Sequence, residues 1–176
     1  MTDIDRQFKG NLGMFLVCAE LSKLNLVAMP TSRNTKGYDI VVLDPKTNAG
    51  AAIQVKCTDQ PQKGFPILTS HWKDYQAKVE EKIMSDFVFV DISDPAKPTY
   101  FIVAREKLKR IVKSLIEQYT REYQQKHSLT WQQMLEKEQK EKRKPDLWVI
   151  RLGDIKAYRD NWDAIKKRLY LEDKTA

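Results

Sequence analysis

Three polar residues in the first third of the chain are spaced so that their side chains can meet on one face of a β-hairpin. Gln54 and Lys56 lie two residues apart in a strand-like run, and alternate residues of a strand point to the same face. Asp39 lies in the strand-like run before them. A register that pairs Asp39 with Gln54 or Lys56 would bring a carboxylate, an amide and an ammonium group together, whereas pairing with Val55 would separate them.

The connection between the two runs favours the first register. The stretch from Asp44 to Ala49 contains a proline and an asparagine and is followed by Gly50, which are residues of tight turns. A loop of this length is usual in a hairpin. We therefore predict antiparallel strands at 38–43 and 51–57.

In the order of these residues the sequence resembles the PD-(D/E)XK, or restriction-endonuclease-like, nuclease superfamily. That family has an αβββαβ core, with an aspartate on one hairpin strand and an acidic residue, any residue and a lysine on the next strand. The matching positions are Asp39 and the run Gln54-Val55-Lys56, and the resemblance covers about residues 8–104.

A glutamate on the first helix often completes the site of that family, and Glu20 is the candidate. Leu16, Val17 and Leu24 lie within one helical turn of it, and a carboxylate in such an apolar setting normally needs a partner.

The sequence departs from the family pattern at two positions. Tyr38 stands in place of the proline, which carries no chemistry. Gln54 stands in place of the acidic residue; its carbonyl can still bind a hard cation, but the site loses one negative charge.

The resemblance implies a site for Mg²⁺ or Mn²⁺ and the hydrolysis of phosphodiester bonds in nucleic acid, with a DNA endonuclease as the expected enzyme. Oxygen ligands suit these ions. The implied ligands are Asp39, the side-chain carbonyl of Gln54, the main-chain carbonyl of Val55, and Glu20 directly or through water. Lys56 is expected to orient the attacking water or to offset charge in the transition state.

Two other functions are compatible with the sequence. One is a degenerate nuclease fold that binds nucleic acid without cutting it, and the other is a protein-interaction domain that uses the charged stretch 124–144. Salt-sensitive binding without cleavage would identify the first, and no nucleic-acid affinity at low salt would identify the second. Because cutting both strands of a duplex often requires two copies of an enzyme, a homodimer is among the expected partners.

The elements that position these residues follow from the apolar pattern. The expected elements are a helix at 8–24, strands at 26–30, 38–43 and 51–57, a helix at 70–83, and strands at 87–92 and 100–104. On the helix at 70–83, Trp72 and Tyr75 are expected in the core and Gln76 as an accessory residue near the substrate. The fold class is therefore α/β, a restriction-endonuclease-like αβββαβ core with a mixed central sheet flanked by helices.

The second half of the chain is expected to add a C-terminal helical extension to a single domain that spans residues 1–176, with the core at about 8–104. Apolar residues from Leu108 to Tyr119 predict a helix after residue 104. A second stripe of that helix is basic and is the expected nucleic-acid contact: Arg105, Lys109 and Lys113. The remaining expectations are a peripheral or mobile helical arm at 124–144, an edge strand at 147–150 and a last helix at 155–169.

The composition favours an anionic partner, because the formal net charge is +7. The longest apolar stretch, Met14 to Ala19, is too short to cross a membrane, and the first residues do not resemble a secretory signal, so a cytoplasmic protein without a membrane partner is expected. Cys18 and Cys57 lie in apolar runs and are expected to be buried free thiols. His71 and His127 lack metal-ligand companions and are expected in surface or capping roles.

Overall fold

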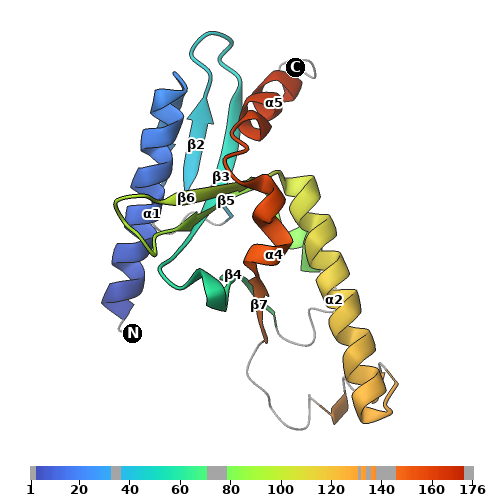
Figure 1. Ribbon diagram of the computed structural model, residues 1–176. Helices are drawn as coiled ribbons and strands as arrows, with labels where there is room; N and C mark the ends of the chain where they lie inside the picture. The colour runs from blue at the N-terminus through green and yellow to red at the C-terminus, as the bar shows by residue number, and fades with distance from the viewer. Residues whose placement is uncertain are drawn as a thin grey trace.

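The computed structural model describes residues 3–32, 37–70, 79–130, 132–133, 136–137 and 146–172. At its centre is a five-stranded sheet with the strand order β1-β2-β3-β5-β6 (Figure 1). Its strands are β1 Val27–Pro30, β2 Ile40–Leu43, β3 Gly50–Thr58, β5 Asp86–Asp91 and β6 Thr99–Val103. The main helices are α1 Asp3–Lys23, α2 Arg105–His127 and α5 Asp163–Glu172. Among the described strands of this sheet, β3 and β5 pair in parallel and the other neighbours pair antiparallel, so the predicted α/β class with a mixed central sheet flanked by helices is confirmed.

The strands predicted at 26–30, 38–43 and 51–57 are confirmed as β1, β2 and β3, and the predicted hairpin has the favoured register. β1 pairs antiparallel with β2, and β2 pairs antiparallel with β3, with Ile40 opposite Ile53. One step further along this register, Asp39 comes opposite Gln54. The turn at 44–49 joins β2 to β3 as predicted.

Helix α1 packs along one face of the sheet and buries Val17 and Leu21. Gly13 permits this close approach, because a Cβ atom at that position would lie 2.5 Å from the Cβ of Cys57. The helix begins at Asp3, before the start predicted at residue 8. The sequence did not indicate this first turn because the residues that precede Phe8 are mostly polar and show no apolar periodicity.

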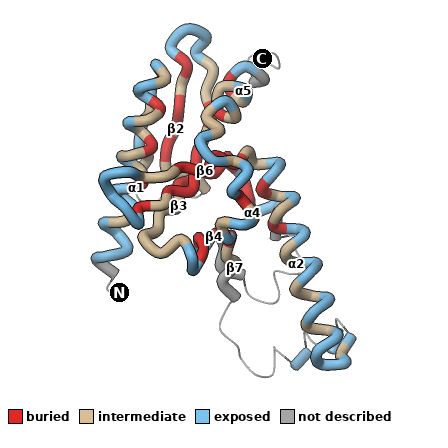
Figure 2. Tube along the Cα trace, viewed as in Figure 1, coloured by how far each residue is buried: buried red, intermediate tan, exposed pale blue. Residues whose placement is uncertain are grey.

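Two apolar clusters cover opposite faces of the sheet, and Figure 2 shows the buried segments running through its strands. The first cluster lies between the sheet, α1 and α5 and includes Ile53 and Ile165. The second lies towards α2 and includes Phe65, Phe89 and Leu108. The rings of Phe65 and Phe89 meet edge to face with centroids 5.3 Å apart.

A separate two-stranded sheet was not predicted. β4, Phe65–Ser70, pairs antiparallel with β7, Asp146–Ile150, so the strand predicted at 147–150 is an edge strand of this small sheet and not of the central one. The helix predicted at 70–83 lies mostly on residues 71–78, outside the described part. Its described ends are Ser70, the last residue of β4, and a 3₁₀ turn at Val79–Lys82.

Helix α2 confirms the helix predicted after residue 104. Leu108 and Val112 are buried, while the C-terminal half extends away from the sheet and ends at Ser128 in a left-handed conformation (Figure 1). Residues 124–127 of the predicted arm belong to this helix, and most of the remainder lies outside the described residues. Within the described part of the chain, none of the helices combines the length and apolar character needed to span a membrane.

The single helix predicted at 155–169 is wrong. The segment is divided into α4, Leu152–Ile155, a 3₁₀ turn at Lys156–Tyr158, and α5. Asp160 adopts a positive φ of 50° and donates its N–H to the carbonyl of Tyr100 on β6 (2.9 Å), which turns the chain between the two helices. The apolar spacing continued across this turn and hid it.

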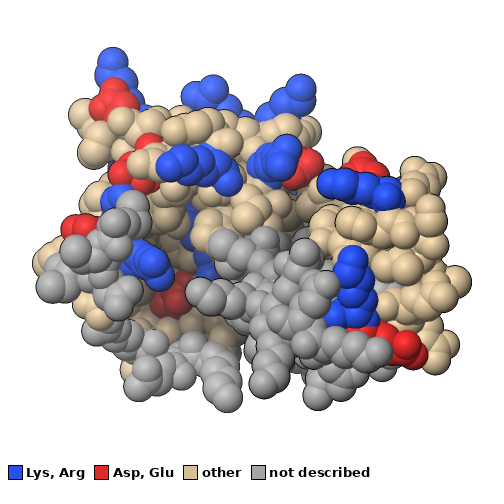
Figure 3. Space-filling view, turned by 90° about the horizontal axis from the view of Figure 1, so that it is seen from below, with Lys and Arg blue, Asp and Glu red and all other residues tan. Residues whose placement is uncertain are grey.

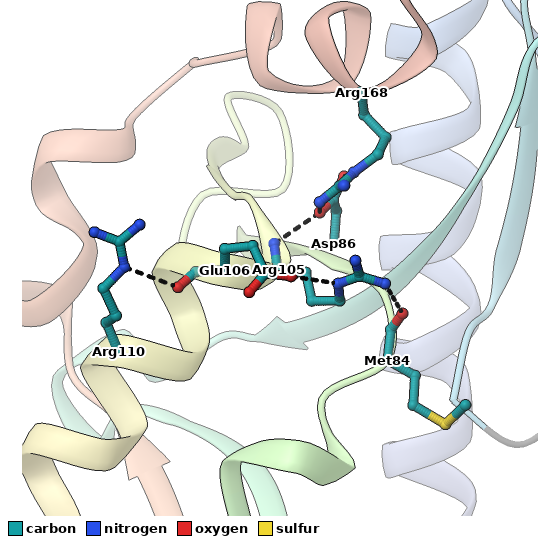
Figure 4. Close-up of polar contacts among 6 residues, drawn as sticks. All are labelled: Met84, Asp86, Arg105, Glu106, Arg110 and Arg168. Carbon is teal, nitrogen blue, oxygen red and sulfur yellow. Dashed lines mark hydrogen bonds and ion pairs between the residues drawn. The ribbon is translucent and has the colours of Figure 1, made fainter. Parts of the chain in front are cut away.

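Asp86, at the start of β5, joins two helices to the sheet (Figure 4). Its side chain is only 1% exposed, and its Oδ1 accepts the main-chain N–H of Arg105 at the first residue of α2 (2.7 Å). The Arg168 guanidinium on α5 donates to both carboxylate oxygens (3.2 and 3.1 Å). The Arg105 side chain points elsewhere, to Glu106 (2.8 Å) and the Met84 carbonyl (3.4 Å).

Candidate active site

Asp39 lies directly before β2 and receives two hydrogen bonds from β3. Its Oδ2 atom accepts the main-chain N–H of Val55 (2.7 Å) and the side-chain N–H of Gln54. Its own main-chain N–H donates to the carbonyl of Ile53 (2.8 Å). The carboxylate is therefore directed across the hairpin to the strand that carries Gln54 and Lys56.

The main-chain groups of Val55 face the Asp39 carboxylate. The Thr58 carbonyl bonds on the β5 side of the strand (2.9 Å), so by alternation the main-chain groups of Val55 and Cys57 point to the opposite edge, beyond the end of β2. Gln54 Nε2 lies 3.5 Å from the Val55 carbonyl while it donates to Asp39. The Gln54 amide thus lies between a carboxylate oxygen and a main-chain carbonyl oxygen.

Lys56 completes this group by charge. Burial raises the pKa of Asp39, and the Val55 N–H and the charge of Lys56 oppose that shift. Burial likewise lowers the pKa of Lys56, and the Asp39 charge opposes it. Each group therefore supports the charged form of the other in a site where burial penalises both.

Glu20 is not brought to this group. Its carboxylate accepts a hydrogen bond from Lys23 (2.7 Å) on the same helix. Burial and, after it, the charge of Glu20 raise the pKa of Tyr100 on β6 to about 12. Glu20 does not line the cavity that contains Asp39, Gln54 and Lys56. The apolar neighbours of Glu20 thus reflect its position above the core.

The Asp39 group opens into a cavity of about 700 Å³. The end of β3 and Asp59, which follows it, line one side with residues 54–59, and α1 lines the other with residues between Arg6 and Met14. Figure 3 shows a hollow on the lower face of the molecule, with basic and acidic side chains within and around it. The remaining lining comes from Thr31, Ser32, Asp39 and Pro66.

Several cavity residues were missed at the sequence level. Arg6, Gln7 and Asn11 on α1 line the cavity, and so do Lys9 and Asp59, which form an ion pair across it (2.5 Å). The sequence does carry a signal for the helical ones, because positions 7, 10, 11 and 14 fall on one helix face. Arg6 and Gln7 precede the predicted start of the helix at residue 8, and the polar Asn11 lies outside the apolar stripe that predicted the helix.

The oxygen donors of the site suit Mg²⁺ in kind but are few. They are the Asp39 carboxylate, the Val55 carbonyl and the Gln54 amide oxygen, all hard donors. No group of three or more His, Cys, Asp or Glu residues suited to a metal occurs among the described residues. Mg²⁺ is commonly held by one or two carboxylates together with water and substrate phosphates, so this set fits an ion that arrives with its substrate.

The predicted basic stripe is divided in the structure. Arg105 lines a second cavity of about 360 Å³, which shares no lining residue with the Asp39 cavity. Lys109 is half-buried and Lys113 is exposed further along α2. None of the three lines the Asp39 cavity.

Other candidates fall outside the site. His71, Trp72, Tyr75 and Gln76 lie outside the described residues. The His127 ring packs on Tyr123 with centroids 4.3 Å apart. Cys18 and Cys57 are half-buried free thiols, less buried than predicted, and burial raises the pKa of Cys57 to about 12, which makes it a poor nucleophile.

Comparison with known proteins adds no relative: no protein-family model, curated protein or solved structure matches the chain.

The raised pKa of Asp39 predicts that Asp39→Asn stabilises the protein at neutral pH. The folded state binds the Asp39 proton more tightly than the unfolded state, so stability falls as pH rises from the usual aspartate range through the raised pKa. A neutral amide avoids this loss, so we expect Asp39→Asn to be more stable than the wild-type protein at pH 7, with a difference that shrinks towards pH 3. Urea denaturation of both proteins across this range measures it; a variant less stable at pH 7 would contradict it.

Proposed function

We propose that the chain is a metal-dependent nuclease with a restriction-endonuclease-like core, most simply a DNA endonuclease. The proposal rests on one observation. The Asp39 carboxylate, the Gln54 amide and the Val55 carbonyl converge at the N-terminal end of β2, beside the part of β3 that extends past it, and the charges of Asp39 and Lys56 interact there. These are the groups that the resemblance to the PD-(D/E)XK superfamily assigns to metal binding and catalysis.

Asp39, Gln54 and Val55 would hold Mg²⁺ or Mn²⁺. Gln54 would turn its amide so that Oε1 takes the place of Nε2, an exchange that keeps the shape of the side chain. The Val55 N–H would hold the Asp39 carboxylate in place. The ion, when bound, supplies Lewis-acid polarisation of the scissile phosphate and lowers the pKa of a bound water.

Lys56 would act on the phosphate and the attacking water. Its ammonium group can donate a hydrogen bond to the water and can offset the negative charge that develops on the phosphate oxygens. The Asp39 charge keeps the ammonium form available despite burial. The half-buried position limits screening by solvent, which strengthens this electrostatic effect.

Cleavage of plasmid, single-stranded and branched DNA with Mg²⁺ or Mn²⁺, and with EDTA as the control, tests the function. We expect metal-dependent cleavage by the wild-type protein and at least a 100-fold loss in Asp39→Asn, which keeps the size of the side chain but removes the charged ligand. Equal cleavage by both purified proteins would indicate a contaminating nuclease. No cleavage of any substrate with either metal would refute the proposal.

The second candidate is a nucleic-acid-binding module without catalysis. The observation that favours it is the charge of the cavity, whose described lining includes Arg6, Lys9 and Lys56 beside Asp39 and Asp59. It predicts binding that needs no metal and weakens with salt, with a log-log slope of about −0.9 for each phosphate neutralised on duplex DNA.

A further inference from the structure

The Asp39 cavity is a trough between two antiparallel walls. Gly13 of α1 contacts Cys57 of β3, and, moving outwards along both elements, Lys9 meets Asp59. The β3 wall runs from Gln54 to Asp59, which is roughly 16 Å at the usual rise of a strand. The catalytic candidates thus lie at one end of the trough, and the Lys9–Asp59 ion pair lies at the other.

The trough offers contacts suited to a sugar-phosphate backbone. By strand alternation the main-chain N–H of Cys57 points to the cavity side of β3, between the two ends. Lys9 and Arg6 add positive charge from α1, and Gln7 and Asn11 add amides. Gly10 leaves space on the helix wall, because a Cβ atom there would have no neighbour within 4 Å.

The ion pair limits what can enter. The Lys9 ammonium and the Asp59 carboxylate form an ion pair that joins the two walls, with Nζ and Oδ2 2.5 Å apart. The whole cavity has a volume of only about 700 Å³. A base-paired duplex carries its phosphates on a broad convex surface and cannot be inserted between these walls. A single strand can lie along the trough, with room for a few nucleotides.

We propose that this trough takes an unpaired nucleic-acid strand, and that Lys9 leaves Asp59 to bind a backbone phosphate a few nucleotides from the bond that is cut. The inference rests on the proposed function, and it names the substrate class as single-stranded or locally unpaired nucleic acid. Asp59 holds Lys9 in position until the strand arrives and competes with the phosphate for it.

This exchange predicts opposite effects for the two members of the ion pair. Lys9→Gln removes a phosphate contact and should weaken binding of single-stranded DNA roughly tenfold. Asp59→Asn removes the competitor and a repelling charge and should strengthen binding several-fold. A purely structural ion pair would give losses in both variants. Both side chains are partly exposed, so each substitution should lower the free energy of unfolding by less than about a tenth of the value usual for a domain. Both variants should therefore fold.

Fluorescence anisotropy with labelled DNA in EDTA measures binding apart from cleavage. The probes are a single strand of about 20 nucleotides and the blunt duplex of the same sequence. We expect the single strand to bind at least about tenfold more tightly, and Lys9→Gln to make its log-log salt slope shallower by about 0.7. Lys46→Gln, which removes an exposed lysine on the turn at the far end of the hairpin, is the matched control and should leave binding unchanged.

Gly10→Leu gives a second variant that acts through shape alone. Space around Gly10 lets the helix accept the larger residue, and the added side chain should narrow the trough and lower single-strand affinity without loss of thermal stability. Equal affinity for the two probes, or losses in both Lys9→Gln and Asp59→Asn, would overturn the inference. The expected binding pattern without any cleavage in Mg²⁺ would instead refute the proposed nuclease function. Cleavage of the blunt duplex without a preference for the single strand would refute only the proposal that the trough takes an unpaired strand.

Discussion

Lys56→Ala should lower the kcat of DNA cleavage by about 10²–10³-fold, with a smaller change in KM. A group that stabilises charge developing in the transition state contributes to kcat more than to binding, and removal of one such donor typically has this effect. Burial disfavours the charged form of Lys56 in the folded state, so loss of the charge should not by itself destabilise the protein. Single-turnover cleavage rates at saturating DNA, with urea denaturation of both proteins, measure the two effects.

The pH dependence of cleavage provides the control for Lys56. The pKa of Lys56 is lowered from 10.5, so the wild-type rate should fall on the alkaline side as the ammonium form is lost below that value. Lys56→Arg keeps a cation that does not titrate in this range, so it should retain part of the activity and shift this alkaline decline upwards. An unchanged kcat in Lys56→Ala would show that the chemistry lies elsewhere.

Asp86→Ala should destabilise the protein by about 3–5 kcal/mol, the range for breaking a buried ion pair by removing one member. The change leaves the Arg168 guanidinium without the carboxylate that accepts hydrogen bonds from its Nε and one terminal nitrogen. It also removes the acceptor of the first N–H of α2, where Ala104 offers no side-chain cap. A loss of this size is a large part of the stability of an ordinary domain.

Glu106→Gln is the matched control for Asp86. Glu106 belongs to the same group of side chains in Figure 4, but its ion pair with Arg105 is solvent-exposed, so its removal should cost no more than about 1 kcal/mol. Thermal and urea denaturation of the two variants would give the comparison. Similar losses for both would mean that the burial of Asp86 contributes nothing beyond a surface contact.

The sequence predicted the hairpin well because its signals are local. Strand alternation and the turn residues at 44–49 determined the register, and that register brings Asp39 to Gln54. The buried strand at 87–92 was recognisable from its apolar run and forms β5 in mid-sheet. Metal binding by these residues and the hydrolysis of phosphodiester bonds stay predictions.

The parts that the sequence did not predict depend on contacts between distant segments. β4 contains Pro66 and owes its strand form to pairing with β7, about eighty residues later, which no local pattern specifies. Glu20 could be assigned to the first helix, but its direction over the sheet depends on how α1 packs. The Lys9–Asp59 contact likewise joins residues that only the folded chain brings together.

The placement of α5 has a consequence for biosynthesis. Ile165 and Leu169 fill the same apolar cluster as Val17 and Leu21, so this layer combines residues from the earliest and latest parts of the described chain. During translation, Arg168 is still inside the ribosome when the segments from α1 to β7 have emerged. Asp86 therefore cannot yet form its ion pair with Arg168. This apolar layer therefore stays incomplete until α5 has joined it, so in cotranslational folding it should form after the segments that precede α5.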